Sequence, residues 1–124
     1  MIRKFSVDVT TNGSGAATAY SPYLTGYIVD IEYVKTDFAD GVDFTITAEA
    51  TGRGLWTESN VNAAAIKAPR QPTHSLVGAA QLYASGGTAV NDRIALSRDR
   101  VKIVIASGGD TKVGEFVITV DDGR

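Results

Sequence analysis

The sequence contains no cysteine, only one histidine and only one tryptophan among its 124 residues. Without cysteine the chain can form neither a disulfide nor a thiolate site. It also has no run of about 18 apolar residues, which is the length that a membrane-spanning helix needs. Its amino-terminal segment MIRKFSVDV lacks the apolar stretch of a secretory signal peptide. We therefore expect synthesis in a cytoplasm and no membrane partner.

The chain also lacks an excess of charge of either sign. It has 12 basic and 14 acidic residues, which gives a net charge of −2. Proteins that bind nucleic acid normally carry a basic patch or stripe, so we expect no nucleic-acid partner. The length suits one domain with a core of its own, and we expect residues 1–124 to form a single unit.

Apolar and polar residues alternate along much of the chain, which predicts β-strands with one buried face. Residues 4–10 alternate strictly, and residues 27–35 and 42–51 do so as well. The pair Asp40-Gly41 lies between the last two segments and is a strong signal for a hairpin. The sequence therefore predicts that residues 27–35 and 42–51 pair as antiparallel strands.

The carboxyl-terminal stretch predicts a second hairpin. Residues 101–106 and 115–120 are rich in β-branched side chains, and the segment between them is rich in Gly, Ser and Asp. Pairing them would leave aliphatic side chains on the face away from the core, so we expect a partner subunit to cover that face. Four side chains form this expected patch: Val104, Val117, Val34 and Ile28.

Residues 52–74 form the longest segment without a regular pattern, and we expect an irregular loop there. Pro69 and Pro72 disfavour regular structure between them. We predict that the following segment, residues 75–85, forms a strand, since Gly78 weakens a helix. Seven or eight short strands result, and the predicted fold is a single-domain, all-β antiparallel sandwich or jelly roll.

No motif in the sequence predicts catalysis, a metal site or a cofactor site. Asp37, Asp40 and Asp43 resemble a calcium loop, but their spacing differs from the EF-hand pattern and suits a solvated turn. His74 has no nucleophile motif beside it. Residues 107–112 are glycine-rich but lack the P-loop spacing, and no helix follows them. We expect a protein that is not an enzyme and that needs no cofactor.

The candidate functional residues are therefore contact residues. Trp56 lies in the polar context TGRGLWTESN, and tryptophan and arginine are enriched at interface hot spots. The alternative is that Trp56 closes one end of the domain's own core. The predicted interface residues are Arg53, Trp56, Lys67, Arg70, Val104 and Val117.

Four stretches of the chain resemble small virion proteins of tailed bacteriophages. These are VDFTITAEATGRGLWTESNVNA (42–63), APRQPTH (68–74), GGTAV (86–90) and RDRVKIVIASGGDTKVGEFVITV (98–120). The likeness lies within residues 42–120 and carries no catalytic motif. A looser likeness, in size and strand pattern, is to the jelly-roll cement proteins that lock phage capsids.

The resemblance implies a structural protein of the virion. The leading hypothesis is a capsid decoration or cement protein that binds the outside of the assembled head and stabilises it. Its partner would be the major capsid protein or another virion protein, and we expect a homo-oligomer, a dimer or trimer. The alternatives are a head–tail connector or tail component and, in another class, a carbohydrate-binding sandwich with Trp56 as its platform.

Overall fold

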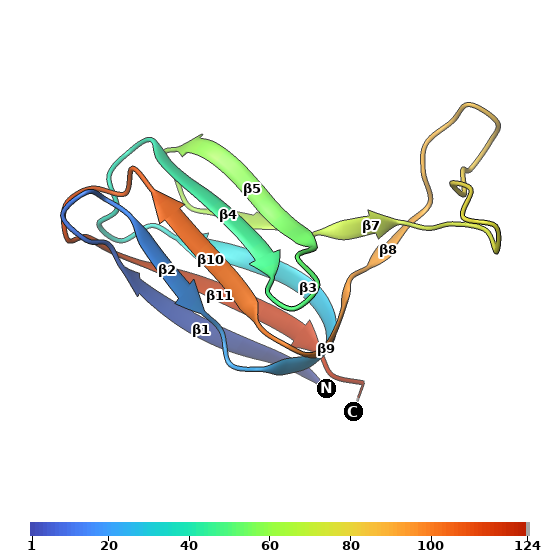
Figure 1. The fold of residues 1–124 in the computed structure, drawn as a ribbon, viewed down its shortest axis with the longest axis horizontal. Helices are drawn as coiled ribbons and strands as arrows, with labels where there is room; N and C mark the ends of the chain where they lie inside the picture. Colours follow the sequence, from blue (N-terminus) through green and yellow to red (C-terminus); the bar gives the residue numbers. More distant parts are fainter. Residues whose placement is uncertain (124) are drawn as a thin grey trace.

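The structure is a computed structural model that describes residues 1–123 as an all-β body with one projecting hairpin (Figure 1). Eleven strands and no helix occur in this part of the chain. The strands are β1 (Ile2–Thr10), β2 (Ala17–Tyr20), β3 (Leu24–Val34), β4 (Val42–Ala48), β5 (Gly54–Val61), β6 (Ala65–Lys67), β7 (Arg70–Pro72), β8 (Asn91–Arg93), β9 (Ala95–Asp99), β10 (Val101–Ala106) and β11 (Val113–Asp121).

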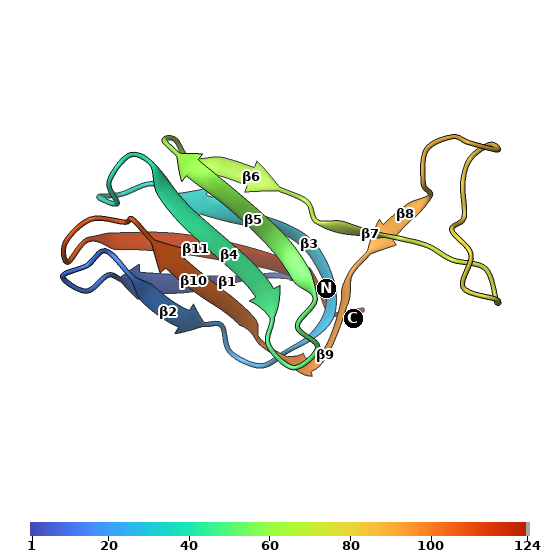
Figure 2. The same ribbon diagram turned by 45° about the horizontal axis from the view of Figure 1, so that its top comes forward.

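Two antiparallel sheets make up the body. The first sheet has the order β1-β11-β3-β6, and β9 also pairs with β3. The two short partners share one edge of β3, with β6 along residues 31–33 and β9 along residues 24–27. The second sheet has the order β2-β10-β4-β5, and β7 and β8 pair separately as a two-stranded ribbon. Figure 2 shows the second sheet lying across the first.

The two sheets share one hydrophobic core, because each strand turns its apolar face toward the other sheet. Tyr33 of β3 and Phe116 of β11 stack at 5.2 Å between ring centroids. Phe44 of β4, in the other sheet, lies 5.4 Å from Tyr33 and 5.2 Å from Phe116. Aromatic rings at these separations attract one another beyond the area that they bury. The burial of Tyr33, which the alternation predicts, is confirmed.

Both predicted hairpins are wrong. The strand β10 pairs with β2 and β4 in the second sheet, while β11 pairs with β1 and β3 in the first. The segments 27–35 and 42–51 are separated in the same way, since β3 and β4 belong to different sheets. Alternation identifies the buried face of a strand but not the strand that pairs with it. The six-residue loop 107–112 between β10 and β11 is long enough to cross the roughly 10 Å between packed sheets.

The segment 52–74 is more regular than its sequence predicts. It contains β5, β6 and β7, and β5 pairs along β4 at the edge of the second sheet. A polar edge strand shows little alternation, which explains why the pattern was weak. The reverse holds for residues 75–85, where a strand was predicted. There the chain forms turns with only isolated bridges, and Gly78 adopts a positive φ of 79° that does not occur in a regular strand.

Candidate functional site

The most distinctive feature of the molecule is a hairpin that leaves the body between β6 and β9. We call residues 70–93 the arm. Its base is the ribbon of β7 and β8, in which Arg70 lies opposite Arg93 and Pro72 opposite Asn91. Both ribbon views show the arm extending well beyond the two sheets (Figures 1 and 2). Its outer part therefore has to be organised by its own contacts.

Backbone hydrogen bonds within the arm supply that organisation. The amide of Thr73 donates to the carbonyl of Val90 at 2.8 Å, and the amide of Gln81 donates to the carbonyl of Thr73 at 3.0 Å. The amide of Val90 in turn donates to Gln81 at 3.0 Å, which ties the two legs and the turn between them together. The arm is thus a shaped element with its own internal bonding.

We call residues 73–90 the outer arm. It exposes apolar side chains, and no Asp, Glu, Lys or Arg occurs between Arg70 and Asp92. The exposed fractions of Leu76, Val77 and Tyr83 are 107%, 88% and 76%. Single exposed apolar residues are common, but a group of them on a projecting, uncharged element is typical of a surface that binds another protein.

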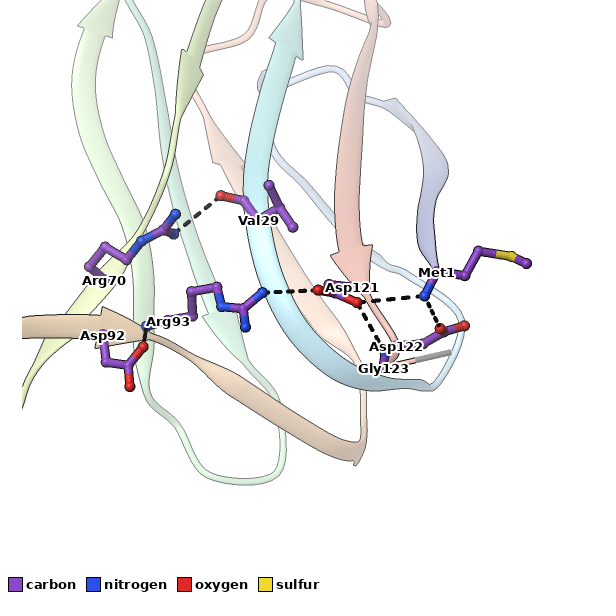
Figure 3. Close-up of polar contacts among 8 residues, drawn as sticks. All are labelled: Met1, Val29, Arg70, Asp92, Arg93, Asp121, Asp122 and Gly123. Carbon is purple, nitrogen blue, oxygen red and sulfur yellow. Dashed lines mark hydrogen bonds and ion pairs between the residues drawn. The ribbon is translucent and has the colours of Figure 1, made fainter.

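Two arginines fix the base of the arm to the body (Figure 3). The Arg93 guanidinium donates to the Asp121 carboxylate at 3.1 Å and lies 4.5 Å from the centroid of the Tyr27 ring. Arg70 donates to the backbone carbonyl of Val29 at 3.2 Å. The pKa of Asp121 is held below its ordinary value by the Gly123 amide first and then by Arg93. These contacts set the direction in which the arm leaves the body.

Three predicted contact residues come together at this base. The Arg53 guanidinium donates to the side-chain carbonyl of Gln71. Lys67 and Arg70 lie on the exposed stretch that leads into the arm. We call Arg53, Lys67 and Arg70 the basic collar. These basic side chains lie at or just before the foot of a projection that carries no Asp, Glu, Lys or Arg from residue 71 to residue 91.

Trp56 does not belong to this surface, and the prediction that it is an exposed contact is wrong. Its side chain is 7% exposed and packs edge-on against Phe44 at 4.8 Å between ring centroids. Its indole Nε1 donates to the Glu58 carboxylate at 2.9 Å. The tryptophan closes the core beneath β5, so the platform on which the carbohydrate-binding alternative depended is not available.

The expected patch of four aliphatic side chains does not form either. Val104 lies on β10 in the second sheet and Val117 on β11 in the first, so they face opposite sides of the body. Val34 lies on the first sheet with Val117, but Ile28 is fully buried. The patch depended on the pairing of β10 with β11, and it is lost with that pairing.

The three aspartates that resembled a calcium loop are already used by the protein. Asp37 accepts from the amide of Val113, and Asp43 accepts from the amide of Asn60 at 2.8 Å. Asp40 forms an ion pair of 3.0 Å with Lys35. Throughout residues 1–123, no three His, Asp or Glu side chains are placed to hold a metal ion together. His74 is exposed on the arm, in a bridge with Ala80.

The glycine-rich segment 107–112 is the loop that carries the chain from one sheet to the other. The amide of Gly108 donates to the carbonyl of Gly15, and its carbonyl accepts from the amide of Ala39, both at 2.9 Å. A Cβ on Gly108 would lie 2.9 Å from the Thr11 methyl group. The glycine is therefore required for close packing of three loops.

A cleft of about 370 Å³ lies where the start of β1, the start of β3 and the end of β11 meet. Phe5, Leu24 and Val120 line it, but Leu24 and Val120 are buried and offer little surface to an occupant. At its margin the guanidinium of Arg3 forms an ion pair of 2.9 Å with the carboxylate of Asp122. The remaining lining residues are Tyr23 and Thr25. Polar and apolar groups therefore line the cleft together, and a charged pair lies at its margin.

Sequence reasoning missed both the outer arm and the cleft. A signal for the arm was present, since a long segment without Asp, Glu, Lys or Arg lies between Arg70 and Asp92 in a chain that is 21% charged overall. The cleft had no such signal, because it combines residues from the start of β1, the start of β3 and the end of β11.

No known protein-family model matches the chain, and no curated protein matches it either. Within the described residues, the structure has no helix with the length and apolar character that a membrane crossing requires.

Proposed function

We propose that this chain is a structural protein of a phage virion, a capsid decoration or cement protein that binds the assembled head. The observation that carries the proposal is the projecting arm with its exposed Leu76, Val77 and Tyr83. An arm of this kind suits contact with a neighbouring protein in a shell. The sequence resemblance to small tailed-phage virion proteins supplies the setting.

The strand order supports the same proposal. Without the three short strands β6, β7 and β8, eight strands remain. We number these eight strands again from first to eighth in chain order, so that β9, β10 and β11 become the sixth, seventh and eighth. One sheet (β1, β11, β3 and β9) then has the order first, eighth, third, sixth. The other sheet (β2, β10, β4 and β5) has the order second, seventh, fourth, fifth. We propose that the body is a jelly roll with this order. Jelly rolls of eight strands occur in viral capsid proteins and also in lectins and cupins, so the order supports a virion role without establishing it.

In this proposal the arm is an insertion between the fifth and sixth strands of the jelly roll, which are β5 and β9. The rigid body presents the arm, and the uncharged outer arm buries its apolar side chains against the neighbour. The basic collar adds ionic contacts around the foot of the arm. A protein that binds only the assembled shell lowers the free energy of that state by mass action. Many copies bound together would add avidity to each single contact.

The test is binding to purified heads that lack this protein. Residues 73–90 are replaced by Asn-Gly, so that a two-residue turn joins Pro72 to Asn91. We expect this variant to keep the fold of the body and to lose binding, measured by co-sedimentation with heads. Lys67→Glu tests the collar, and we expect weaker binding with a smaller dependence on salt. Binding by the shortened variant at the wild-type level would refute the proposed role of the arm.

A head–tail connector or tail component is the second candidate, and the arm favours it as well. An element that reaches from one subunit to the next can build a closed ring when the contacts are head-to-tail. Particle images separate the two roles, since copies distributed over the whole shell indicate decoration and a ring at one vertex indicates a connector.

A further inference from the structure

We propose that the cleft formed by the start of β1, the start of β3 and the end of β11 binds a small neutral saccharide. The inference goes beyond the proposed function and does not rest on it. Three observations carry it: the mixed polar and apolar lining of the cleft, the exposed tyrosine at its wall, and the way in which the chain builds it.

The lining of the cleft argues against other classes of ligand. It exposes more polar than apolar surface, and Leu24 and Val120 are only 4% and 2% exposed, so an aliphatic ligand would bury little area there. The guanidinium of Arg3 already pairs with the carboxylate of Asp122 at 2.9 Å, so an anion would have to displace that partner. Asp122 is the single carboxylate among the described lining residues, whereas calcium takes about six to eight oxygen ligands. A neutral ligand with several polar groups fits this lining.

The hydroxyl groups of a sugar match the polar side of the cleft, because each hydroxyl both donates and accepts. The pair of Arg3 with Asp122 places N–H donors beside carboxylate oxygens, and a carboxylate has room for about four hydrogen bonds. The Thr25 hydroxyl accepts from the amide of Arg98 at 3.1 Å, and its own proton can be donated to a ligand. Adjacent sugar hydroxyls can therefore bond to both members of the charged pair, and hydrogen bonds to charged groups are the stronger ones.

Tyr23 supplies the apolar side of the site. Its side chain lines the cleft and is 64% exposed, so it offers the carbon surface on which the C–H face of a sugar ring can pack. The Arg100 guanidinium lies 5.3 Å from the centroid of the Tyr23 ring, and Glu49 holds that guanidinium with bonds of 2.7 Å and 2.9 Å. The ring is thus held in place before a ligand arrives, which lowers the entropy cost of binding.

The backbone around the cleft is built for close approach. Gly26 has a φ of 139°, and a Cβ at this position would lie 2.4 Å from the carbonyl oxygen of Asp121. Glycine therefore allows the start of β3 to lie against the end of β11, which brings Thr25 and Asp122 to one cleft. In the same region the register of β3 shifts against both β9 and β11. Such irregularities in β-sheets are common beside functional sites, where they redirect side chains.

The size of the cleft limits the ligand. A volume of about 370 Å³ is at the small end of the range for ligand sites, so it suits one or two sugar rings. A ligand of that size makes few contacts, and we expect a dissociation constant that is roughly millimolar.

The primary experiment is a titration of the whole chain, followed by the amide shifts in proton–nitrogen NMR spectra. The probes are glucose, galactose, mannose, N-acetylglucosamine, maltose and lactose. We expect at least one of them to cause saturable shifts at the amides of Tyr23, Thr25, Gly26 and Asp122. Glucose 6-phosphate and adenosine are the comparators for an anionic and an aromatic ligand, and each should bind at least about tenfold more weakly than the best neutral sugar.

Variants then test the two sides of the site. Tyr23→Ala should weaken binding by roughly fivefold or more, and Tyr23→Phe should keep most of it. Tyr27→Ala is the matched control, since Tyr27 is also an exposed tyrosine with a guanidinium over its ring, that of Arg93, but is not among the described residues that line the cleft. Asp122→Asn should weaken binding by roughly tenfold or more, whereas Asp8→Asn, an exposed carboxylate elsewhere on β1, should bind like the wild type.

The absence of saturable shifts with every sugar of the panel would overturn the proposal, as would shifts confined to residues outside the cleft or tighter binding of either comparator. Equal losses in Tyr23→Ala and Tyr27→Ala would reject Tyr23 as the stacking surface. If the alanine variant at Tyr23 loses its folded spectrum, the comparison of Asp122→Asn with Asp8→Asn decides the question.

The virion role is tested separately by co-sedimentation with heads. A protein that binds heads but no sugar would reject the saccharide site and leave the proposed function standing. A protein that binds a sugar in the cleft but never binds heads would support the site and reject the decoration role.

Discussion

Phe44 on β4 and Phe116 on β11 meet edge to face across the two sheets, with their ring centroids 5.2 Å apart and their planes at 81°. The contact joins the segments that sequence patterns assigned to two separate hairpins. Tyr33 and Trp56 extend it on either side, since Tyr33 contacts both phenylalanines and Trp56 contacts Phe44. This aromatic cluster holds the sheets together, and it makes the core sensitive to changes that the surface would tolerate.

Trp56→Ala should destabilise the body by about 3–5 kcal/mol, because it removes a buried ring and leaves a cavity beside Phe44. Trp56→Phe, which keeps an aromatic ring, should lose less. Urea denaturation followed by fluorescence or circular dichroism measures the difference. An alanine variant with an unchanged denaturation midpoint would mean that Trp56 is not part of the core.

Gly114→Ala should destabilise the protein by about 1–3 kcal/mol, because overpacking a filled core forces side chains out of place. A Cβ at this position would lie 2.4 Å from Cε2 of Phe38, which is itself 2% exposed. Gly54→Ala is the matched control in another strand, since no heavy atom lies within 4 Å of its Cβ position. We expect the control to change stability by less than about 0.5 kcal/mol. Equal effects at the two positions would contradict the close contact with Phe38.

Acid should weaken the protein partly through Glu49. The Arg100 guanidinium donates to the two carboxylate oxygens of Glu49 at 2.7 Å and 2.9 Å, and this holds the pKa of Glu49 below its ordinary value of 4.5. A lowered pKa in the folded state gives stability that is present above the ordinary value and is lost as the pH falls through the folded value. The loss should therefore begin below about pH 4.5.

Carboxyl chemical shifts of Glu49, followed by NMR during an acid titration, measure this pKa directly. Glu49→Gln should flatten that part of the stability profile, while Glu32→Gln removes a carboxylate elsewhere and keeps the ion pair. A Glu49 titration midpoint at or above its ordinary value would rule out the assigned role of Arg100.

Tyr33→Phe should leave stability unchanged or raise it by up to about 1 kcal/mol, because a buried hydroxyl without a partner costs free energy. The Tyr33 hydroxyl is buried and has no hydrogen-bond partner among the described residues. Burial, and next the negative charge of Asp40, raise the pKa of this phenol. Tyr33→Leu is the control that also removes the ring contacts, and it should be destabilising. A clear loss of stability in the phenylalanine variant would indicate a hydrogen bond to an internal water molecule.

Alternation in the sequence identified the inward side chains of β4 and β10, but it failed in the first half of β3, where an irregularity in the pairing with β11 buries Ile28 and exposes Tyr27. Phe44 and Ile46, predicted to face inward, are 2% and 0% exposed, and Ile103 and Ile105 are equally buried. The choice of partner strand could not be made in this way. A period of two residues records which face is buried, and the same pattern suits a neighbour in the same sheet or a crossing to the opposite one.

The candidate site was predictable only in part. Residue types predict Arg53, Lys67 and Arg70 as contact residues; the structure places them at or just before the base of the arm, and their contact role stays a prediction. Trp56 was assigned to the surface because its neighbours in sequence are polar, yet in an edge strand polar neighbours point outward while the ring points inward. The arm itself has no periodic pattern, so its shape depends on turns that only the folded chain displays.

The pairing of β1 with β11 brings Ile2 opposite Asp121, so an edge of the first sheet depends on segments from opposite ends of the described chain. During synthesis on the ribosome, β1 emerges first and has to remain unpaired until β11 has been made. Contacts between such distant segments slow folding, because closing long loops costs entropy before the contact repays it. The nascent chain thus completes its first sheet late, and newly made copies expose an open strand edge during the period when aggregation competes with folding.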